Sequence, residues 1–356
     1  MRIYKRSSGL IFDDTMGVPH DRWTFIPHSS GSYTSRPGYL RMLHSTIQDR
    51  FALFDLPPGD CVIDIFADYF PVDPTDRAGL VLWQDSVTRA ELLESADLTM
   101  IGDFVKWRAI KIGDSWNLYA KRTDTWYFID TVQIPAVKAG IVVKKGEGPD
   151  LVPLDCDRVV VCCSRYLQVG NILPGYTVTL YSPLEVPIAS KVVEPTFSGV
   201  EIELPALAYE GIIKIHDTES DLVGEMQEVF YGGDLYYHGT YLQVLDTGVE
   251  LLRSDHNNLG VMRNGIIQKK LQLYNPSDSL ISEHIELSII QYNAKFGYQW
   301  ASVAPDIYGS SGPPIDKLNI PSLGPGVTID FWLQVEQGED YMGIAPLYFI
   351  LDIIHN

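Results

Sequence analysis

The sequence predicts an all-β protein, and three observations support this fold class. Apolar and polar residues alternate in 61–70, 79–84 and 281–292, which is the period of a half-buried strand. The chain contains 29 glycines and 22 prolines, and turn signals recur about every 8–12 residues, as in β-sandwiches and barrels. Residues 87–96 have a helix-like pattern, but the segment is short and uncapped, so we expect strand and turn there.

The length of the chain and the positions of its linker-like segments predict three domains. With 356 residues, the chain exceeds the roughly 250–300 at which a single core stops growing. Segment 144–150 is charged, rich in breakers and without apolar periodicity, which is typical of a linker. A second boundary is expected at 228–234. The predicted domains are residues 1–145, 151–229 and 230–356.

The charge balance argues against two classes of partner. The chain carries 27 Lys and Arg against 46 Asp and Glu, a formal net charge of -19. This charge repels phosphate backbones and anionic lipid surfaces, so we expect no nucleic-acid partner. No stretch approaches the ~18 consecutive apolar residues of a membrane span, and we expect no membrane insertion.

The four cysteines predict folding in a reducing compartment. Cys61, Cys156, Cys162 and Cys163 show no C-x-x-C spacing, and the last two would point to opposite faces of one strand. We expect buried free thiols. Residues 7–14 lack the apolar run of ~7–15 residues that a secretory signal requires, so we do not expect signal-directed export.

Short motifs within residues 8–143 follow the order found in one family. They are IFDD at 11–14, DRW at 21–23, GYLRM at 38–42, AGLVLWQ at 78–84, WRAI at 107–110, WNLYA at 116–120 and DTWYF at 124–128. In this order they resemble concanavalin A-like lectin/glucanase modules. The resemblance implies an antiparallel jelly roll of two packed sheets. It departs at Asp124-Thr125, where many relatives have Asp-Gly, which leaves the turn there undetermined.

The two later domains resemble small immunoglobulin-like modules. The segments concerned are NILPGY at 171–176 in the second domain, and LQLYNPS at 271–277, ELSI at 286–289 and GPGVTIDFWL at 324–333 in the third. The resemblance implies a small immunoglobulin-like β-sandwich in each domain, with a spacer or attachment role.

The lectin resemblance implies a sugar-binding site on the concave sheet of the first domain. In such a site one or two aromatic rings stack on sugar rings beside polar groups. The candidate ligand-binding residues are Trp83, Trp116, Trp126 and Tyr127, with the polar Gln84, Glu91, Arg108 and Asn117. The alternative is that the tryptophans fill the core, since aromatic rings dominate core energetics.

Two acidic residues are the candidate metal ligands. Asp13 and Asp14 resemble the acidic pair at the start of lectin-like modules, some of which hold calcium through carboxylate and carbonyl oxygens. The alternative is that they are solvated or capping acids in an opening turn. Calcium is the one cofactor that the resemblance allows, and otherwise we expect none.

Catalytic motifs are missing from the sequence. Laminarinase-type enzymes of the lectin-like fold carry E-x-D-x-E or E-x-D-x-x-E on one strand, where alternation places the carboxylates on one face. Here Asp64 and Asp68 share a strand face without a third acid, and Glu201 and Glu203 form only a pair. There is no G-x-S-x-G elbow and no H-E-x-x-H motif. We therefore expect a protein that is not an enzyme.

Compartment and architecture together predict a bacteriophage virion protein, because lectin-like modules work outside the cell whereas free thiols indicate folding in the host cytoplasm. We expect a multi-copy tail, baseplate or head-surface protein. Its last two domains would attach it to other virion proteins, and its first domain would bind host-surface glycan or a neighbouring subunit.

Two alternatives stay open. One is a bacterial glycan-binding or glycan-active protein, which a carboxylate pair ~5–10 Å apart in a cleft would favour. The other is an architectural protein whose jelly roll binds only protein, which large apolar patches would favour.

Overall fold

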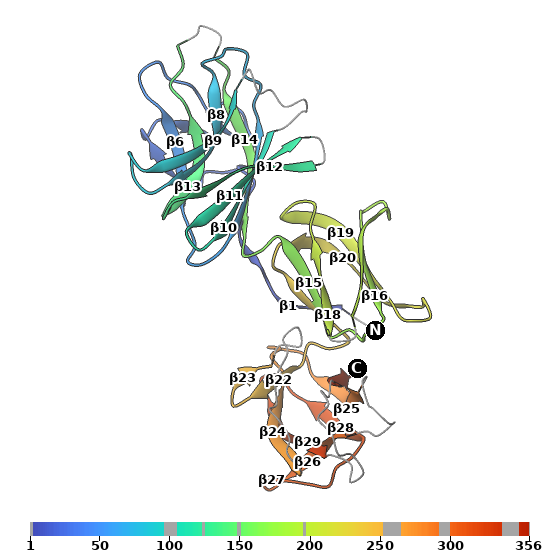
Figure 1. Ribbon diagram of the computed structural model, residues 1–356. Helices are drawn as coiled ribbons and strands as arrows, with labels where there is room; N and C mark the ends of the chain where they lie inside the picture. Colours follow the sequence, from blue (N-terminus) through green and yellow to red (C-terminus); the bar gives the residue numbers. More distant parts are fainter. Residues whose placement is uncertain are drawn as a thin grey trace.

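The structure is a computed structural model that describes residues 3–95, 105–122, 125–147, 151–194, 197–251, 265–291, 300–336 and 349–355. Within these ranges the chain forms thirty β-strands and no helix, so the predicted all-β fold class is confirmed. The strands form three units that follow one another along an elongated molecule (Figure 1). Residues 89–95, from the segment with a helix-like pattern, form a strand as expected.

The first unit consists of two antiparallel sheets around one core. The larger sheet has the order β12 (Thr125–Gln133), β11 (Ser115–Arg122), β10 (Val105–Ile112), β7 (Val62–Asp68), β14 (Leu154–Cys162), β5 (Leu40–Met42), β4 (Gly31–Ser32), with β2 (Leu10–Asp14) also paired to β14. The smaller sheet has the order β3 (Thr24–Ile26), β6 (Arg50–Asp55), β13 (Lys138–Val143), β8 (Arg77–Trp83), β9 (Arg89–Ser95). Phe54, Ile63, Leu80, Trp107 and Trp116 are buried in this core.

The second unit has two sheets of four strands each. One has the order β1 (Ile3–Ser7), β21 (Leu235–His238), β15 (Tyr166–Gly170), β18 (Gly199–Glu203), and β15 and β21 run parallel. The other has the order β17 (Pro187–Val192), β16 (Thr177–Tyr181), β19 (Ala208–His216), β20 (Leu222–Tyr231). Leu167, Ile202, Ile213 and Phe230 belong to the core of this unit.

The third unit pairs a six-stranded sheet with a three-stranded one. The larger has the order β23 (Val249–Glu250), β22 (Gln243–Asp246), β24 (Ile266–Tyr274), β29 (Thr328–Glu336), β26 (Ala301–Ile307), β27 (Ser310–Ser311). The smaller has the order β28 (Lys317–Leu323), β25 (Ser282–Gln291), β30 (Phe349–Ile354). Leu273, Leu287, Val303 and Phe331 belong to their common core.

Strand pairing departs from the predicted division into residues 1–145, 151–229 and 230–356. Strand β14, predicted in the second domain, pairs with β7, β2 and β5 of the first unit. Strands β1 and β21, predicted in the first and third domains, pair with each other in the second unit. An apolar run such as that of β14 indicates a buried strand but does not identify the neighbouring strands. The sequence therefore predicted this strand correctly and assigned it to the wrong sheet. Residues 148–150 of the predicted linker lie outside the described residues.

The first two units share an apolar and charged interface. Val62 lies on the side of the larger sheet that faces away from the core, and it packs in one cluster with Leu207 of the second unit. Arg158 forms a salt bridge with Asp13, whose carboxylate also accepts a hydrogen bond from the Tyr231 hydroxyl. Around β7 and β14, the side of the larger sheet that faces away from the core therefore contacts the second unit.

The cysteines are free, as predicted. Cys61, Cys156 and Cys162 are buried, but Cys163 is exposed, which corrects the expectation of four buried thiols. The difference arises because β14 ends at Cys162, and the chain then leaves the sheet.

Candidate functional site

The outer face of the smaller sheet in the first unit carries its own group of buried apolar side chains. Side chains alternate along each strand, so that Phe54 and Leu80, for example, face the core. The outward-facing residues form a separate cluster, here named the outer face, which consists of Phe51, Leu53, Val81, Trp83 and Val142. These five side chains are 0–9% exposed, so other side chains of the protein cover this apolar face.

Two glycines keep the middle of the outer face free of side chains. Gly140 and Gly79 occupy outward-facing register positions on β13 and β8. A Cβ atom at Gly140 would lie 2.0 Å from the Ala52 carbonyl oxygen, and one at Gly79 would lie 1.9 Å from that of Leu92. Neither strand position admits a side chain unless the neighbouring backbone moves.

Four charged side chains, here named the charged cluster, lie over the outer face. Arg89 donates hydrogen bonds to Glu91 at 2.7 Å and to Asp49 at 3.0 Å. The Lys144 ammonium contacts the same two carboxylates at 2.7 Å from Asp49 and 2.9 Å from Glu91. The side chains are 15–25% exposed, so the cluster is open to solvent on one side.

The charged cluster is placed directly against aromatic rings. The guanidinium carbon of Arg89 lies 5.1 Å from the Phe51 ring centroid and 5.9 Å from that of Trp83. The two rings meet edge to face, with centroids 4.8 Å apart. Arg89 therefore covers the aromatic part of the outer face, in a cation–π geometry.

The electrostatics of the charged cluster keep Asp49 ionised. Burial alone would raise the pKa of Asp49. Hydrogen bonds from the Lys144 ammonium and the Lys145 amide, and the charges of Lys144 and Arg89, outweigh burial and lower the pKa below its ordinary 3.8. The site thus presents charged acceptors and charged donors beside aromatic rings.

The lowered pKa of Asp49 predicts a loss of stability in acid. A pKa depressed in the folded state adds stability that is present above the unfolded value, near 4, and is lost as the pH falls through the folded value. We expect the free energy of unfolding of Asp49→Asn to fall less steeply than that of the wild type below about pH 4. Urea denaturation at a series of pH values measures this, and identical slopes would contradict it.

The structure brings two of the candidate ligand-binding residues together and leaves a third next to them in the chain. Trp83 and Glu91 belong to the outer face and the charged cluster. Gln84 follows Trp83 in the chain and is exposed at the turn that leads to β9, where its backbone N–H donates to the Thr88 carbonyl.

The other five candidates lie elsewhere. Trp116 is fully buried in the core of the first unit, as in the core-filling alternative. Arg108 and Trp126 lie against the second unit: the guanidinium stacks on the indole at 4.2 Å, and the indole nitrogen donates to the Pro205 carbonyl at 3.4 Å. Asn117 and Tyr127 are on the strands β11 and β12, where Asn117 accepts a bond from Thr131 and Tyr127 is exposed.

The predicted metal ligands already have protein partners. The Asp13 carboxylate forms a salt bridge with the Arg158 guanidinium, with 2.6 Å between Oδ2 and Nη2. The Asp14 carboxylate accepts bonds from the Met16 amide at 2.9 Å and the Trp23 indole at 2.8 Å. Among the residues that the structure describes, no group of three or more His, Cys, Asp or Glu side chains could hold a metal ion. These bonds link β2 to Arg158 of β14 and to Met16 and Trp23.

Sequence reasoning missed Phe51, Asp49, Arg89 and Lys144. Arg89 and Glu91 are two residues apart on one strand, so alternation places them on the same face, and the short connection from β8 to β9 pairs Arg89 with Trp83. Asp49 and Lys144 are separated by 95 positions in the chain, and only the pairing of β6 with β13 brings them together.

Fold and site together define an all-β protein of several sandwich-like units with a charged, aromatic surface on the first. No family model matches the chain, and no curated protein matches its sequence. In the described ranges, no helix is long and apolar enough to cross a membrane.

Several solved structures of glycoside hydrolases are similar to part of the chain. The GH43 protein BlXynB of Bacillus licheniformis has 14% identity and a TM-score of 0.36, and the match covers 42% of this chain and 39% of the BlXynB chain. A xylan β-1,4-xylosidase of Bacillus halodurans has 16% identity and a TM-score of 0.34, covering 42% and 38%. A bifunctional GH43-CE protein of Bacteroides eggerthii has 13% identity and a TM-score of 0.36, covering 49% and 30%. The chain thus spans less than half the length of these proteins.

The expectation that the protein is not an enzyme is contradicted by these matches, because the similar structures are glycoside hydrolases. The matches give no support to the virion assignment. With TM-scores below 0.5, they do not assign an activity to this chain.

Proposed function

We propose that the protein binds glycans and that the outer face of the first unit, with the charged cluster, is the binding site. The observation that carries the proposal is that the rings of Trp83 and Phe51 lie beside two carboxylates and two cations on one face of a sheet. A sugar ring presents apolar C–H groups to aromatic rings, and its hydroxyls form charge-assisted hydrogen bonds with carboxylates and guanidinium groups.

In this proposal Arg89 is the group that a sugar displaces. Its guanidinium covers both aromatic rings in the absence of ligand. Moving it off the rings breaks its hydrogen bonds to Glu91, Asp49 and the Ser86 carbonyl, and the hydroxyls of a bound sugar would replace these contacts. Asp49 and Glu91 remain held by Lys144, which keeps both carboxylates in place for sugar hydroxyls.

The finer description of the fold is part of the same proposal. We assign the first unit to the concanavalin A-like jelly rolls and the other two to immunoglobulin-like sandwiches. The support is that each unit packs two sheets around one core, and that the first unit leaves a face of its smaller sheet lined with aromatic side chains.

Replacing Glu91 by glutamine tests the glycan site, because the change keeps the volume and removes the charged acceptor. We expect the full-length wild type to bind members of a glycan array. We expect Glu91→Gln to bind the best of these at least tenfold more weakly, about 1.4 kcal/mol, in calorimetric titration. Asp114→Asn, an exposed acid on the turn between β10 and β11, is the matched control and should bind like the wild type.

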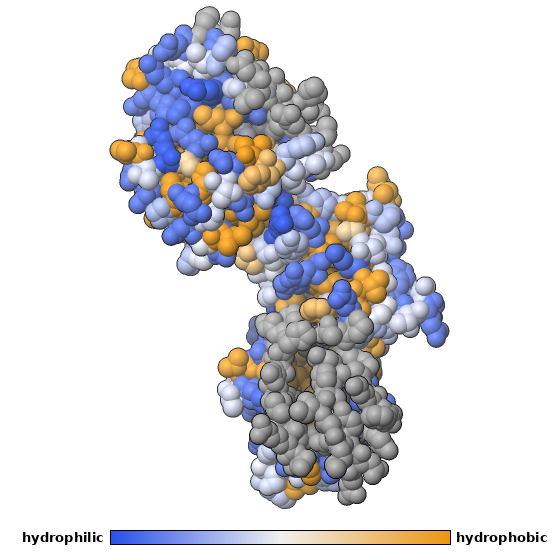
Figure 2. Space-filling model, in the orientation of Figure 1, coloured by the Kyte–Doolittle hydropathy of each residue, from blue (hydrophilic) through white to orange (hydrophobic). Residues whose placement is uncertain are grey.

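The absence of any glycan binding by the folded wild type, or equal binding by Glu91→Gln, would overturn the proposal. Either result would favour the architectural alternative instead. That alternative has its own support in the edge strand β12, where Phe128 and Ile129 are more than half exposed. In Figure 2, hydrophobic side chains lie over the part of the first unit where Figure 1 labels β11 and β12.

A further inference from the structure

A row of basic and aromatic side chains crosses the larger sheet of the first unit, on the side that faces away from the core. Its members lie in register on five neighbouring strands, three of which are β10, β11 and β12 (Figure 1). This basic row consists of Arg158 on β14, Phe66 on β7, Lys106 on β10, Lys121 on β11 and Trp126 on β12. The row and the outer face of the smaller sheet are therefore on opposite sides of the first unit.

Two lysines are paired at the centre of the basic row. Lys106 and Lys121 are directly opposite each other on the antiparallel strands β10 and β11. Residues in this position have Cβ atoms about 4.5–5.5 Å apart, and like charges there destabilise a sheet. The fold thus keeps a lysine pair that repels itself, and an anion bound between the two ammonium groups would relieve the repulsion.

Each ammonium group of the pair is placed against the aromatic ring on its far side. The Nζ atom of Lys106 lies 5.2 Å from the Phe66 ring centroid, and that of Lys121 lies 5.8 Å from the Trp126 ring. Both contacts have a cation–π geometry. All four side chains are partly exposed. The surface between the two lysine stems is therefore bordered by a cation and a ring in each direction.

Contacts with the second unit position both ends of the basic row. At one end Arg158 forms a salt bridge with Asp13, and the Asp13 carboxylate accepts a hydrogen bond from the Tyr231 hydroxyl at 3.2 Å. At the other end the Trp126 indole donates to the Pro205 carbonyl at 3.4 Å. The ends are thus held by the second unit, while the lysine pair between them remains partly exposed.

The carboxylate that acts on Lys106 from below is a poor counter-charge. Asp157 precedes Arg158 on β14, where the pairing with β7 is irregular. Its charge interacts with that of Lys106, but burial raises the pKa of Asp157 and so disfavours its charged form. A carboxylate that approaches Lys106 from the solvent side does not incur the same burial.

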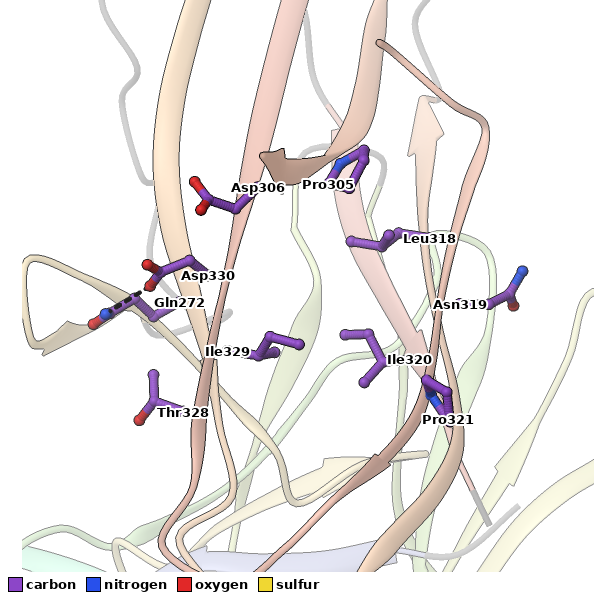
Figure 3. Close-up of a pocket in the computed structure, with 10 residues that line it drawn as sticks. All are labelled: Gln272, Pro305, Asp306, Leu318, Asn319, Ile320, Pro321, Thr328, Ile329 and Asp330. Carbon is purple, nitrogen blue, oxygen red and sulfur yellow. Dashed lines mark hydrogen bonds between the residues drawn. The ribbon is translucent and has the colours of Figure 1, made fainter. Parts of the chain in front are cut away.

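The pocket of the third unit offers no such cation. It has a volume of about 430 Å³, and Figure 3 shows Ile320 and Ile329 facing each other across it. Asp306 and Asp330 lie on the opposite side of the larger sheet (Figure 3). Lys270 lies with them, at 2.8 Å from Asp330 and 3.4 Å from Asp306. Its charge is thus matched by two carboxylates, whereas the charge of Lys106 faces that of a second lysine.

We propose that the basic row binds an acidic sugar, with the sugar carboxylate between Lys106 and Lys121. Ammonium groups form charge-assisted hydrogen bonds with a carboxylate, and the C–H groups of the adjoining sugar rings would pack on the rings of Phe66 and Trp126. Because the net charge of -19 repels long polyanions, we expect a glycan with isolated acidic residues. This site is separate from the charged cluster on the outer face and does not depend on it.

The test uses the full-length protein and a synthetic trisaccharide whose central residue is glucuronic acid and whose other residues are glucose. Calorimetric titration should show binding of this acid, and roughly tenfold weaker binding of its methyl ester, which has nearly the same shape without the charge. Affinity for the acid should fall as salt is raised from about 50 to 500 mM. A glycine peptide with one central glutamate should bind as weakly as the ester.

Lys106→Gln should weaken binding of the acid roughly tenfold. Without ligand, its midpoint of urea denaturation should equal or exceed that of the wild type, because the variant removes one of two facing cations. Lys106→Arg keeps the charge and should bind within about threefold of the wild type. Lys191→Gln, an exposed cation on β17, is the matched control and should leave binding unchanged.

Equal binding of the acid and its methyl ester, or no binding of the acid by the folded wild type, would overturn the proposal. Equally tight binding of the glutamate peptide would replace the sugar with an acidic protein segment as the ligand. Weaker binding by Lys106→Gln together with a lower urea midpoint would show that Lys106 acts only through the fold, which also contradicts the proposal.

Discussion

Replacing Asp64 by alanine is expected to destabilise the first unit by about 3–5 kcal/mol. Both carboxylate oxygens of Asp64 accept hydrogen bonds from the Arg108 guanidinium, at 2.7 and 2.8 Å, and the two side chains are 0% and 2% exposed. The same carboxylate accepts a bond from the Leu207 amide of the second unit. Without Asp64, the guanidinium would be left as an uncompensated charge inside the interface.

Urea denaturation followed by tryptophan fluorescence measures this effect, since five of the seven tryptophans precede residue 127 and lie in the first unit. The matched control is Asp64→Leu combined with Arg108→Met, which removes both charges and should recover most of the lost stability. A loss below about 1 kcal/mol for Asp64→Ala would show that the pair is not desolvated as the structure indicates.

The second large effect is expected from Trp116→Ala, which should lower the free energy of unfolding by about 3–5 kcal/mol. Trp116 is fully buried between the two sheets, and its indole nitrogen donates to the Ile134 carbonyl at 3.2 Å. Alanine would leave a cavity and an unpaired carbonyl. Glycan binding by the fraction that remains folded should be unchanged, because the residue lies away from the outer face.

Tyr127→Ala is the control for the tryptophan variant, because Tyr127 is 50% exposed. Its effect should stay within about 0.5 kcal/mol, as is usual for surface substitutions. If Trp116→Ala were as stable as the wild type but no longer bound glycan, the sequence-based assignment of Trp116 to the sugar site would be right and the core position wrong.

The candidate site was predictable where it depends on one strand or on adjacent residues. Trp83 and Glu91 were identified from their motif and polarity, and both lie at the outer face. Trp126 has the same kind of side chain as Trp83, yet its indole donates to the Pro205 carbonyl of the second unit. A tryptophan in a strand can face a core, an interface or a ligand surface, and strand alternation alone does not distinguish the three.

The sequence by itself determined the all-β class and the position of most strands, because these follow from local alternation and turn residues. Only the tertiary structure decided that β14 completes the first unit, that β1 joins the second, and that Asp49 meets Lys144. The physical reason is that a strand's own residues specify burial and face. Its partners are selected by packing and hydrogen bonding with segments far away in the chain.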